Sequence, residues 1–323
     1  MKKDPWFRNH FIRDSIYRAI YYKMKVDSSI YLMGEGSHMK VRFDAPYIEK
    51  EFPNRIITLP ISEDANTNFA LGMSLAGVKP IVDVISSDFL FRTMDGICNT
   101  VAKENFIAEE KKTVIIRSEF LTGAPTAGQR LESLFTHIPG LNVVLPSNPA
   151  DARALMNEAL SLPEATIFFE DRMIPDSTTS PSDLDDGLPK KMPFGVGCLR
   201  RIGSKLTIVS YALTLRMLDR LLAEQQLDYE LIDLRCLYPV DYTLIAQSVH
   251  KTGALLIVEP DIAYSGIGAE IAAQISDRCF SSLRQPVRRI GSPRGVIPAS
   301  IGLHEKVIPS GQDILRLAKE MSY

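Results

Sequence analysis

The chain has 323 residues, of which 45% are apolar and 24% charged, and its formal net charge is −2. A chain of this length predicts two domains of ordinary size, and the composition is that of a globular protein with sizeable cores. The near-neutral charge gives no electrostatic reason to expect nucleic acid or an anionic membrane as a partner.

Targeting and metal-binding signals are missing from the sequence. The first 31 residues contain no continuous apolar run like that of a signal peptide, and nowhere do about 18 apolar residues follow one another. The four cysteines are far apart and the five histidines are scattered, so no zinc site, disulfide framework or other metal site is predicted. We therefore expect a protein of the reducing cytoplasm, with no membrane partner and no metal ligands of its own.

Short apolar segments alternate with helical patterns along the whole chain, which is typical of a parallel, doubly wound α/β fold. In the first half, strands are predicted at residues 29–33, 56–59, 80–85, 113–117, 142–145 and 165–170. Helices are predicted at residues 88–102, where apolar residues recur at helical spacing, and after Asn148-Pro149.

A stretch rich in Pro, Ser, Thr and Asp, residues 173–195, lacks periodicity and predicts a linker. A second series follows, with strands predicted at residues 206–211, 229–234 and 254–259 and helices at 215–226 and 268–275. The expected organisation is therefore two doubly wound α/β domains, at residues 1–172 and 196–323.

The segment Pro60-Ile61-Ser62-Glu63-Asp64 lies between an apolar strand and a stretch of small residues. Ser62 is a candidate N-cap for the helix that follows, and Gly77 a candidate for its end. This places Glu63 at the carboxyl end of a buried strand and at the mouth of a helix. Taken alone, the pattern favours the simpler interpretation that Glu63 complements the helix dipole.

Most familiar catalytic motifs are absent from the sequence, including the P-loop, G-x-S-x-G, H-E-x-x-H, and G-x-G-x-x-G after a strand. His137 is expected to end a helix, and His250 to lie exposed near a helix C-terminus. His38 follows the first strand, in the loop region where the sites of α/β proteins gather. For His38, too, an ordinary surface loop is the simpler interpretation.

Several segments, taken in order, resemble the beta subunit of the thiamine-diphosphate-dependent 2-oxo-acid dehydrogenases, in the transketolase-like superfamily. The resemblance covers about residues 13–317. The segments that carry it are Tyr31-Leu32-Met33-Gly34-Glu35, Pro60-Ile61-Ser62-Glu63, 70–80, Thr136-His137-Ile138-Pro139-Gly140-Leu141, 144–148, 231–235 and 266–271. It implies a transketolase-like pyrimidine-binding domain followed by a transketolase C-terminal-like domain.

The resemblance gives Glu63 a role that the chemistry of thiamine diphosphate explains. The cofactor's own aminopyrimidine accepts the proton of the thiazolium carbon when a carboxylic group hydrogen-bonds its ring nitrogen. Glu63 matches that group, and burial would favour its protonated form. Phe89 matches the aromatic residue against the pyrimidine face, and Glu35 an acid near the site entrance. The alternatives are a core role for Phe89 and a solvated loop position for Glu35.

One missing motif implies a partner chain. Enzymes of this superfamily hold the diphosphate through Mg²⁺ with a Gly-Asp-Gly segment and a later Asn, and this chain contains no Gly-Asp-Gly. The resemblance therefore implies an alpha subunit that supplies the Mg²⁺ site, in an α₂β₂ assembly with the cofactor between chains. A lipoyl acyltransferase is a further expected partner, and subunit packing the expected role of the second domain.

The sequence also departs from the family pattern. Dehydrogenase beta subunits usually carry His-Ser-Gln where this chain has Ala127-Gly128-Gln129-Arg130. The missing imidazole puts transfer to a lipoyl arm in doubt. Gln129 and Arg130 are candidate substrate contacts, because Arg can hold a phosphate or carboxylate, and His38 is a candidate replacement proton carrier. A specialised carboligase or split transketolase subunit, and a non-catalytic assembly subunit, are alternatives.

Overall fold

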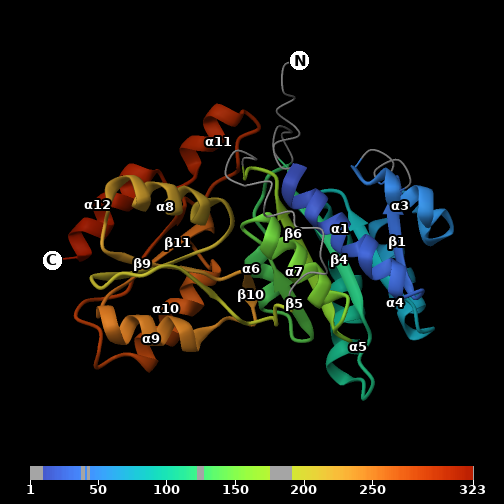
Figure 1. Cartoon of the computed structure of the whole chain (residues 1–323), viewed down its shortest axis with the longest axis horizontal. Helices are drawn as coiled ribbons and strands as arrows, with labels where there is room; N and C mark the ends of the chain where they lie inside the picture. Colours follow the sequence, from blue (N-terminus) through green and yellow to red (C-terminus); the bar gives the residue numbers. More distant parts are fainter. Residues whose placement is uncertain (1–9, 38–40, 42–43, 122–126, 175–190, 323) are drawn as a thin grey trace.

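Two β-sheets lie side by side in the computed structural model, each covered by helices (Figure 1). The structure describes residues 10–37, 41, 44–121, 127–174 and 191–322. The predicted two-domain α/β architecture is confirmed. In each sheet the strands are parallel except for one at an edge.

The first sheet has the strand order β10-β5-β6-β4-β3-β1-β2. Its strands are β1 (Ile30–Glu35), β2 (Ile56–Leu59), β3 (Lys79–Val84), β4 (Val114–Phe120), β5 (Leu141–Val144), β6 (Ala165–Asp171) and β10 (Cys236–Tyr238). All seven residues of β4 and of β6 are buried, as expected for central strands covered on both faces.

The helical segments of the first domain connect these strands. They are α1 (His10–Val26), α3 (Pro46–Glu51), η1 (Pro53–Arg55), α4 (Glu63–Leu75), η2 (Ser87–Thr93), η3 (Gly96–Val101), α5 (Ala102–Ile107), α6 (Glu132–Thr136) and α7 (Pro149–Ala159). Helix α4 begins after Ser62, as predicted, although no side-chain capping bond forms there, and Gly77 follows its C-cap with φ +87°. In α7, the Asn148 side chain accepts a bond from the Asp151 N–H, which confirms the predicted start.

The predicted helix at residues 88–102 is only partly correct. The segment is helical, but η2 is a 3₁₀-helix and η3 a π-helix rather than one regular α-helix. Leu90, Ile97 and Val101 are buried as the spacing predicts. Phe89 lies off this buried stripe and is 39% exposed, so it is not a core residue of the chain.

The second sheet has the strand order β12-β11-β8-β9-β7. Its strands are β7 (Cys198–Arg201), β8 (Leu206–Ser210), β9 (Tyr229–Asp233), β11 (Leu255–Ile262) and β12 (Arg288–Ser292), and its helices are α8 (Ala212–Gln225), α9 (Tyr242–Thr252), α10 (Ile267–Arg278), α11 (Ile301–Val307) and α12 (Gly311–Met321). Helices α8 and α12 cover one face and α9 and α10 the other (Figure 1). The expected position of His250, exposed in the last turn of α9, is confirmed.

The two domains are joined by more than the linker. Strand β10, from the second half of the chain, pairs antiparallel with β5 of the first sheet. One apolar cluster runs from the first sheet through β10 to residues such as Ile257 and Ile271 of the second domain. A separate cluster lies under α8 and α12. The continuous core fixes the position of the second domain against the first.

Candidate active site

Four adjacent parallel strands bring the predicted site residues to one edge of the first sheet. The order β2-β1-β3-β4 means that these strands end side by side. Glu35 is the last residue of β1 and is in register with Leu59, the last residue of β2, four positions before Glu63. Phe89 follows β3 and Gln129 follows β4. In open α/β sheets this carboxyl edge is where ligands bind.

Glu35 and Glu63 are both half-buried at this edge. Within the described residues, neither carboxylate has a hydrogen bond or an ion pair. The turn before Glu63 is held instead by Asn66, whose side-chain amide donates to the Pro60 carbonyl at 3.1 Å. The Glu63 carboxylate is therefore positioned by a fixed turn and left available to a ligand.

Apolar side chains surround this carboxylate edge. Ile61 is 74%, Phe89 39% and Phe91 54% exposed. Exposed apolar groups of this size beside an available acid are typical of a surface that a ligand or another chain covers. An aromatic ring near a carboxylate fits the aminopyrimidine of thiamine diphosphate, which offers a flat face and a ring nitrogen.

The loop at residues 127–130 is tied directly to the turn that carries Phe89. The Asp88 carboxylate accepts hydrogen bonds from Ser86 Oγ at 3.0 Å and from the Gly128 N–H at 3.1 Å. Ser87 Oγ donates to the Gln129 carbonyl at 3.4 Å. The structure thus fixes the backbone at Gln129 against the turn that leads to Phe89, and a shared site for the two residues stays a prediction.

Gly128 has a backbone conformation that a side chain would strain, with φ +96°. A Cβ at this position would lie 3.1 Å from the Leu121 carbonyl oxygen and 3.1 Å from Cγ2 of Ile297. The serine of the usual family pattern would not fit here without a shift. Because Ile297 belongs to the second domain, that domain contacts the loop of the candidate site.

Arg130 is turned into the protein and is 9% exposed. Its Nη1 lies 2.9 Å from Asp171 Oδ2, its Nε 3.0 Å from Glu132 Oε1, and its guanidinium carbon 4.0 Å from the centre of the Phe120 ring. An anionic substrate would have to displace one of two buried carboxylates to reach it. Burial raises the pKa of Glu132 to about 8, against the opposing effect of Arg130.

Two further groups at this edge were not anticipated from the sequence. His304 of α11 and Tyr211, which follows β8, are buried near Arg130, and both come from the second domain. No periodicity or motif marks either residue, so only the folded chain shows their positions. His38, the predicted proton carrier, lies outside the described residues. His137 terminates α6 as predicted.

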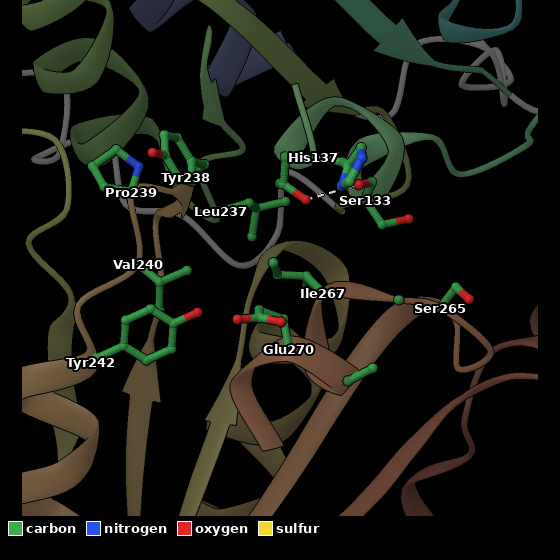
Figure 2. A pocket seen from close by; sticks show the side chains of 13 residues that line it. Ser133, His137, Leu237, Tyr238, Pro239, Val240, Tyr242, Ser265, Ile267 and Glu270 are labelled. Carbon is green, nitrogen blue, oxygen red and sulfur yellow. Dashed lines mark hydrogen bonds between the residues drawn. The ribbon is translucent and has the colours of Figure 1, made fainter. Parts of the chain in front are cut away.

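A cleft of about 640 Å³ lies between the domains and is lined by residues of α6, β10 and α10 (Figure 2). Figure 2 shows Ser133 of α6 and His137, which follows that helix, facing Ile267 and Glu270 of α10 across it. None of the predicted cofactor or substrate residues lines this cleft. Among the residues that the structure describes, no group of three or more His, Cys, Asp or Glu is placed to hold a metal ion.

Comparison with known protein families identifies the class to which this architecture belongs. The model described as transketolase, pyrimidine binding domain, matches residues 12–175, and that described as transketolase, C-terminal domain, matches residues 195–314. The chain therefore belongs to the transketolase family, as the sequence segments indicated.

Within that family, the relatives are beta subunits of pyruvate dehydrogenase E1. The chain is 30% identical to the mitochondrial beta-1 subunit of Arabidopsis thaliana, over 97% of this chain and 89% of the relative. It is 29% identical to the mitochondrial beta-2 subunit of Oryza sativa subsp. japonica, over 97% and 86%, and 28% identical to the beta subunit of Rickettsia felis, over 97% and 98%.

Solved structures share the fold at lower identity. The chain superposes on a split gene transketolase, described as an inactive beta4 tetramer, with a TM-score of 0.80 and 19% identity, over 96% of this chain and 97% of that one. The transketolase of Leishmania mexicana gives 0.71 and 14%, over 96% of this chain but only 45% of its own. Within the described part of the chain, no helix has the length and apolar character needed to cross a membrane.

Proposed function

We propose that this chain is the beta-type subunit of a two-chain thiamine-diphosphate enzyme that decarboxylates a 2-oxo acid and transfers the acyl or aldehyde unit. Its part of the site is the half that holds the aminopyrimidine. The observation that carries the proposal is the convergence of Glu35, Glu63, Phe89 and the loop at residues 127–130 on one sheet edge. The relatives named as pyruvate dehydrogenase beta subunits support the reaction class.

The residues present fit one half of the cofactor. Glu63 would hold the ring nitrogen of the aminopyrimidine and Phe89 would pack against its face. When bound, the cofactor supplies a nucleophilic carbon that can add to the carbonyl of a 2-oxo acid. Glu63 contributes by keeping a proton at that nitrogen, for which a carboxylate without internal partners is suited. Gln129, held by Ser87, offers an uncharged amide to the substrate.

The other half of the cofactor requires a second chain. The sequence contains no Gly-Asp-Gly segment for the diphosphate and its Mg²⁺. An alpha subunit that carries this segment, in an α₂β₂ assembly, would complete the site and cover the exposed Ile61 and Phe91. In the isolated chain the cofactor would be held by one end alone, so we expect weak binding and no turnover.

The test begins with the chain that co-purifies with this one. Thiamine diphosphate with Mg²⁺ is titrated calorimetrically into this chain, into the partner and into the mixture, and only the mixture is expected to bind tightly. Tight binding by this chain alone would contradict the half-site. The mixture is then supplied with pyruvate and other 2-oxo acids, and release of CO₂ is measured.

A second pair of assays on the same mixture identifies the molecule that accepts the acyl or aldehyde unit. Formation of an acyl-lipoyl domain would establish a dehydrogenase with a lipoyl acyltransferase partner. Carbon–carbon ligation with an aldehyde, without acyl-lipoyl product, would establish a carboligase or split transketolase. If the mixture binds the cofactor but turns over no 2-oxo acid, the result would favour the alternative that this chain is a non-catalytic assembly subunit.

A further inference from the structure

Helix α11 of the second domain buries a histidine at the junction with the first domain. His304 is 6% exposed, whereas its neighbour Leu303 is 53% exposed, and Glu305 and Lys306 are exposed as well. A short surface helix stabilised by apolar contacts would bury its leucine. The burial of the imidazole instead indicates that this helix is placed for a polar group.

The segment that leads to α11 lies over the loop of the candidate site. Ile297 is buried against Gly128, with Cγ2 3.1 Å from the position of a Cβ there. Seven residues later, His304 is within electrostatic reach of Arg130, at the end of the same loop, and of Asp171, the last residue of β6. Figure 1 shows α11 near the boundary between the domains. Residues 297–304 thus cover the loop from the second domain.

The imidazole of His304 is neutral and can accept a proton. Its Nδ1 is fully buried and has no hydrogen-bond partner among the described residues, so this ring nitrogen is open to a proton or a polar ligand. Burial lowers the pKa of His304 below its usual range. Arg130 acts in the same direction, while Asp171 and Glu305 oppose it. The ring is therefore neutral near pH 7 and can take up a proton.

We propose that His304 is the proton-accepting imidazole of this site, supplied by the second domain in place of the imidazole that the loop at residues 127–130 lacks. The inference rests on the proposed function. Transfer of an acyl or aldehyde unit between carbonyl compounds interconverts a hydroxyl and a carbonyl oxygen. One proton must leave the first oxygen and one must reach the second, and an imidazole can take the former and return the latter.

Activity measurements on the two-chain enzyme test the proposal through its pH dependence. We expect His304→Gln to lower kcat/KM by about 10²-fold or more near neutral pH and to remove the fall in activity on the acid side that imidazole protonation causes. His250→Gln is the matched control, because His250 is exposed on α9 and its ring contacts only second-domain groups among the described residues, Ser282 Oγ at 2.8 Å and Cys279 Sγ at 3.9 Å. A His304→Gln enzyme with the wild-type rate and pH profile would overturn the proposal.

Two further measurements are needed. One distinguishes loss of the proton acceptor from loss of the fold, and the other tests His304 independently of the proposed reaction. Imidazole added to folded His304→Ala enzyme is expected to restore activity, and a folded variant that it does not rescue counts against the proposal. In the full chain alone, an NMR titration assigned with His304→Gln is expected to show a neutral ring at pH 7. A protonated His304 would exclude the role even if the two-chain enzyme proved inactive and the proposed function failed.

Discussion

Acids stand at the carboxyl ends of strands in both sheets, but the outer strands of the first sheet carry two that differ in state from those of the second sheet. At the first edge, Glu35 and Glu63 are half-exposed and have no hydrogen bond or ion pair within the described residues. At the second edge, Asp233, Glu259 and Asp261 are at most 2% exposed and fully engaged. Strand ends of the same kind thus leave two acids half-exposed at β1 and after β2, whereas Asp171 at the end of β6 and the acids of the second sheet are buried and paired.

The partners at the second edge show what those acids do. Glu259 accepts from Arg289 Nη2 at 2.7 Å and from the Gly268 N–H at 2.9 Å, which fixes the start of α10. Asp261 accepts from Ser133 Oγ of the first domain at 2.8 Å. A buried acid that the chain itself satisfies is structural. The second edge thus helps to hold the domains together, and the half-exposed acids of the first edge are the ones that the proposed function assigns to a ligand.

The sharpest test of this contrast compares two acids in the same helical turn. Glu63→Gln in the two-chain enzyme is expected to lower kcat by about 10²–10⁴-fold, because the amide cannot hold a proton at the cofactor's ring nitrogen. Asp64→Asn, one residue on and exposed, is expected to leave kcat unchanged. Steady-state kinetics decides the point. Equal and small effects would show that both acids only complement the helix dipole.

The second largest effect is expected on stability, at the closed edge. Asp233 accepts from Arg200 Nη2 at 2.9 Å and from Ser147 Oγ at 3.1 Å. Asp233→Ala leaves Arg200 without this partner and is expected to lower the free energy of unfolding by about 3–5 kcal/mol. Glu35→Ala at the open edge should change it by less than about 0.5 kcal/mol. Urea denaturation of both variants measures the difference, and similar losses would erase the contrast.

A smaller loss of stability is expected at the loop of residues 127–130, where Gly128 of the first domain contacts Ile297 of the second. Gly128→Ser introduces a side chain at φ +96° and against Ile297, and should lower the free energy of unfolding by about 1–3 kcal/mol. Gly295→Ser is the control, since a Cβ there meets no atom within 4 Å. Denaturation midpoints compare the two. A Gly128→Ser chain as stable as the control would show that the loop can move away from the second domain.

Much of the first edge could be predicted from the sequence because its signals are local. Ser62 and Gly77 bound α4 as expected, and the resemblance to the family predicted that Glu63 and Phe89 contact the same pyrimidine ring. The actual shape of residues 87–101 could not be predicted in this way. A Cβ at Gly96 would lie 2.8 Å from Asp64 Oδ1, so the π-helix reflects close packing against α4, a contact distant in sequence.

The second domain's contribution escaped prediction for the same physical reason. Strand β10 has three residues, and its partner β5 lies about ninety positions earlier, so no periodicity reveals the pairing. His304 is a single histidine in a helix whose other described residues are not buried. Its position against Arg130 follows from the shared core of the domains, which sequence patterns do not encode. The boundaries 1–172, 173–195 and 196–323 stay predictions, as does the role of His38.

The smallest expected effect is on the pH dependence of the free energy of unfolding, and it tests whether the buried Glu132 carries a proton near neutral pH. Glu132 is fully buried beside Arg130 and Asp261, and its pKa is raised from 4.5 to about 8. The folded chain therefore keeps a proton that the unfolded chain has released, and this contribution to stability is lost as the pH rises from about 4.5 through about 8.

The variant Glu132→Gln is neutral at this position at every pH. Between about pH 7 and about pH 8, its free energy of unfolding should fall less than that of the wild type, by on the order of 1 kcal/mol, because each pH unit below the folded pKa changes the wild type by at most about 1.4 kcal/mol. Urea denaturation at both pH values measures this. Parallel curves would mean that Glu132 is charged throughout and forms an ion pair with Arg130 over this whole pH range.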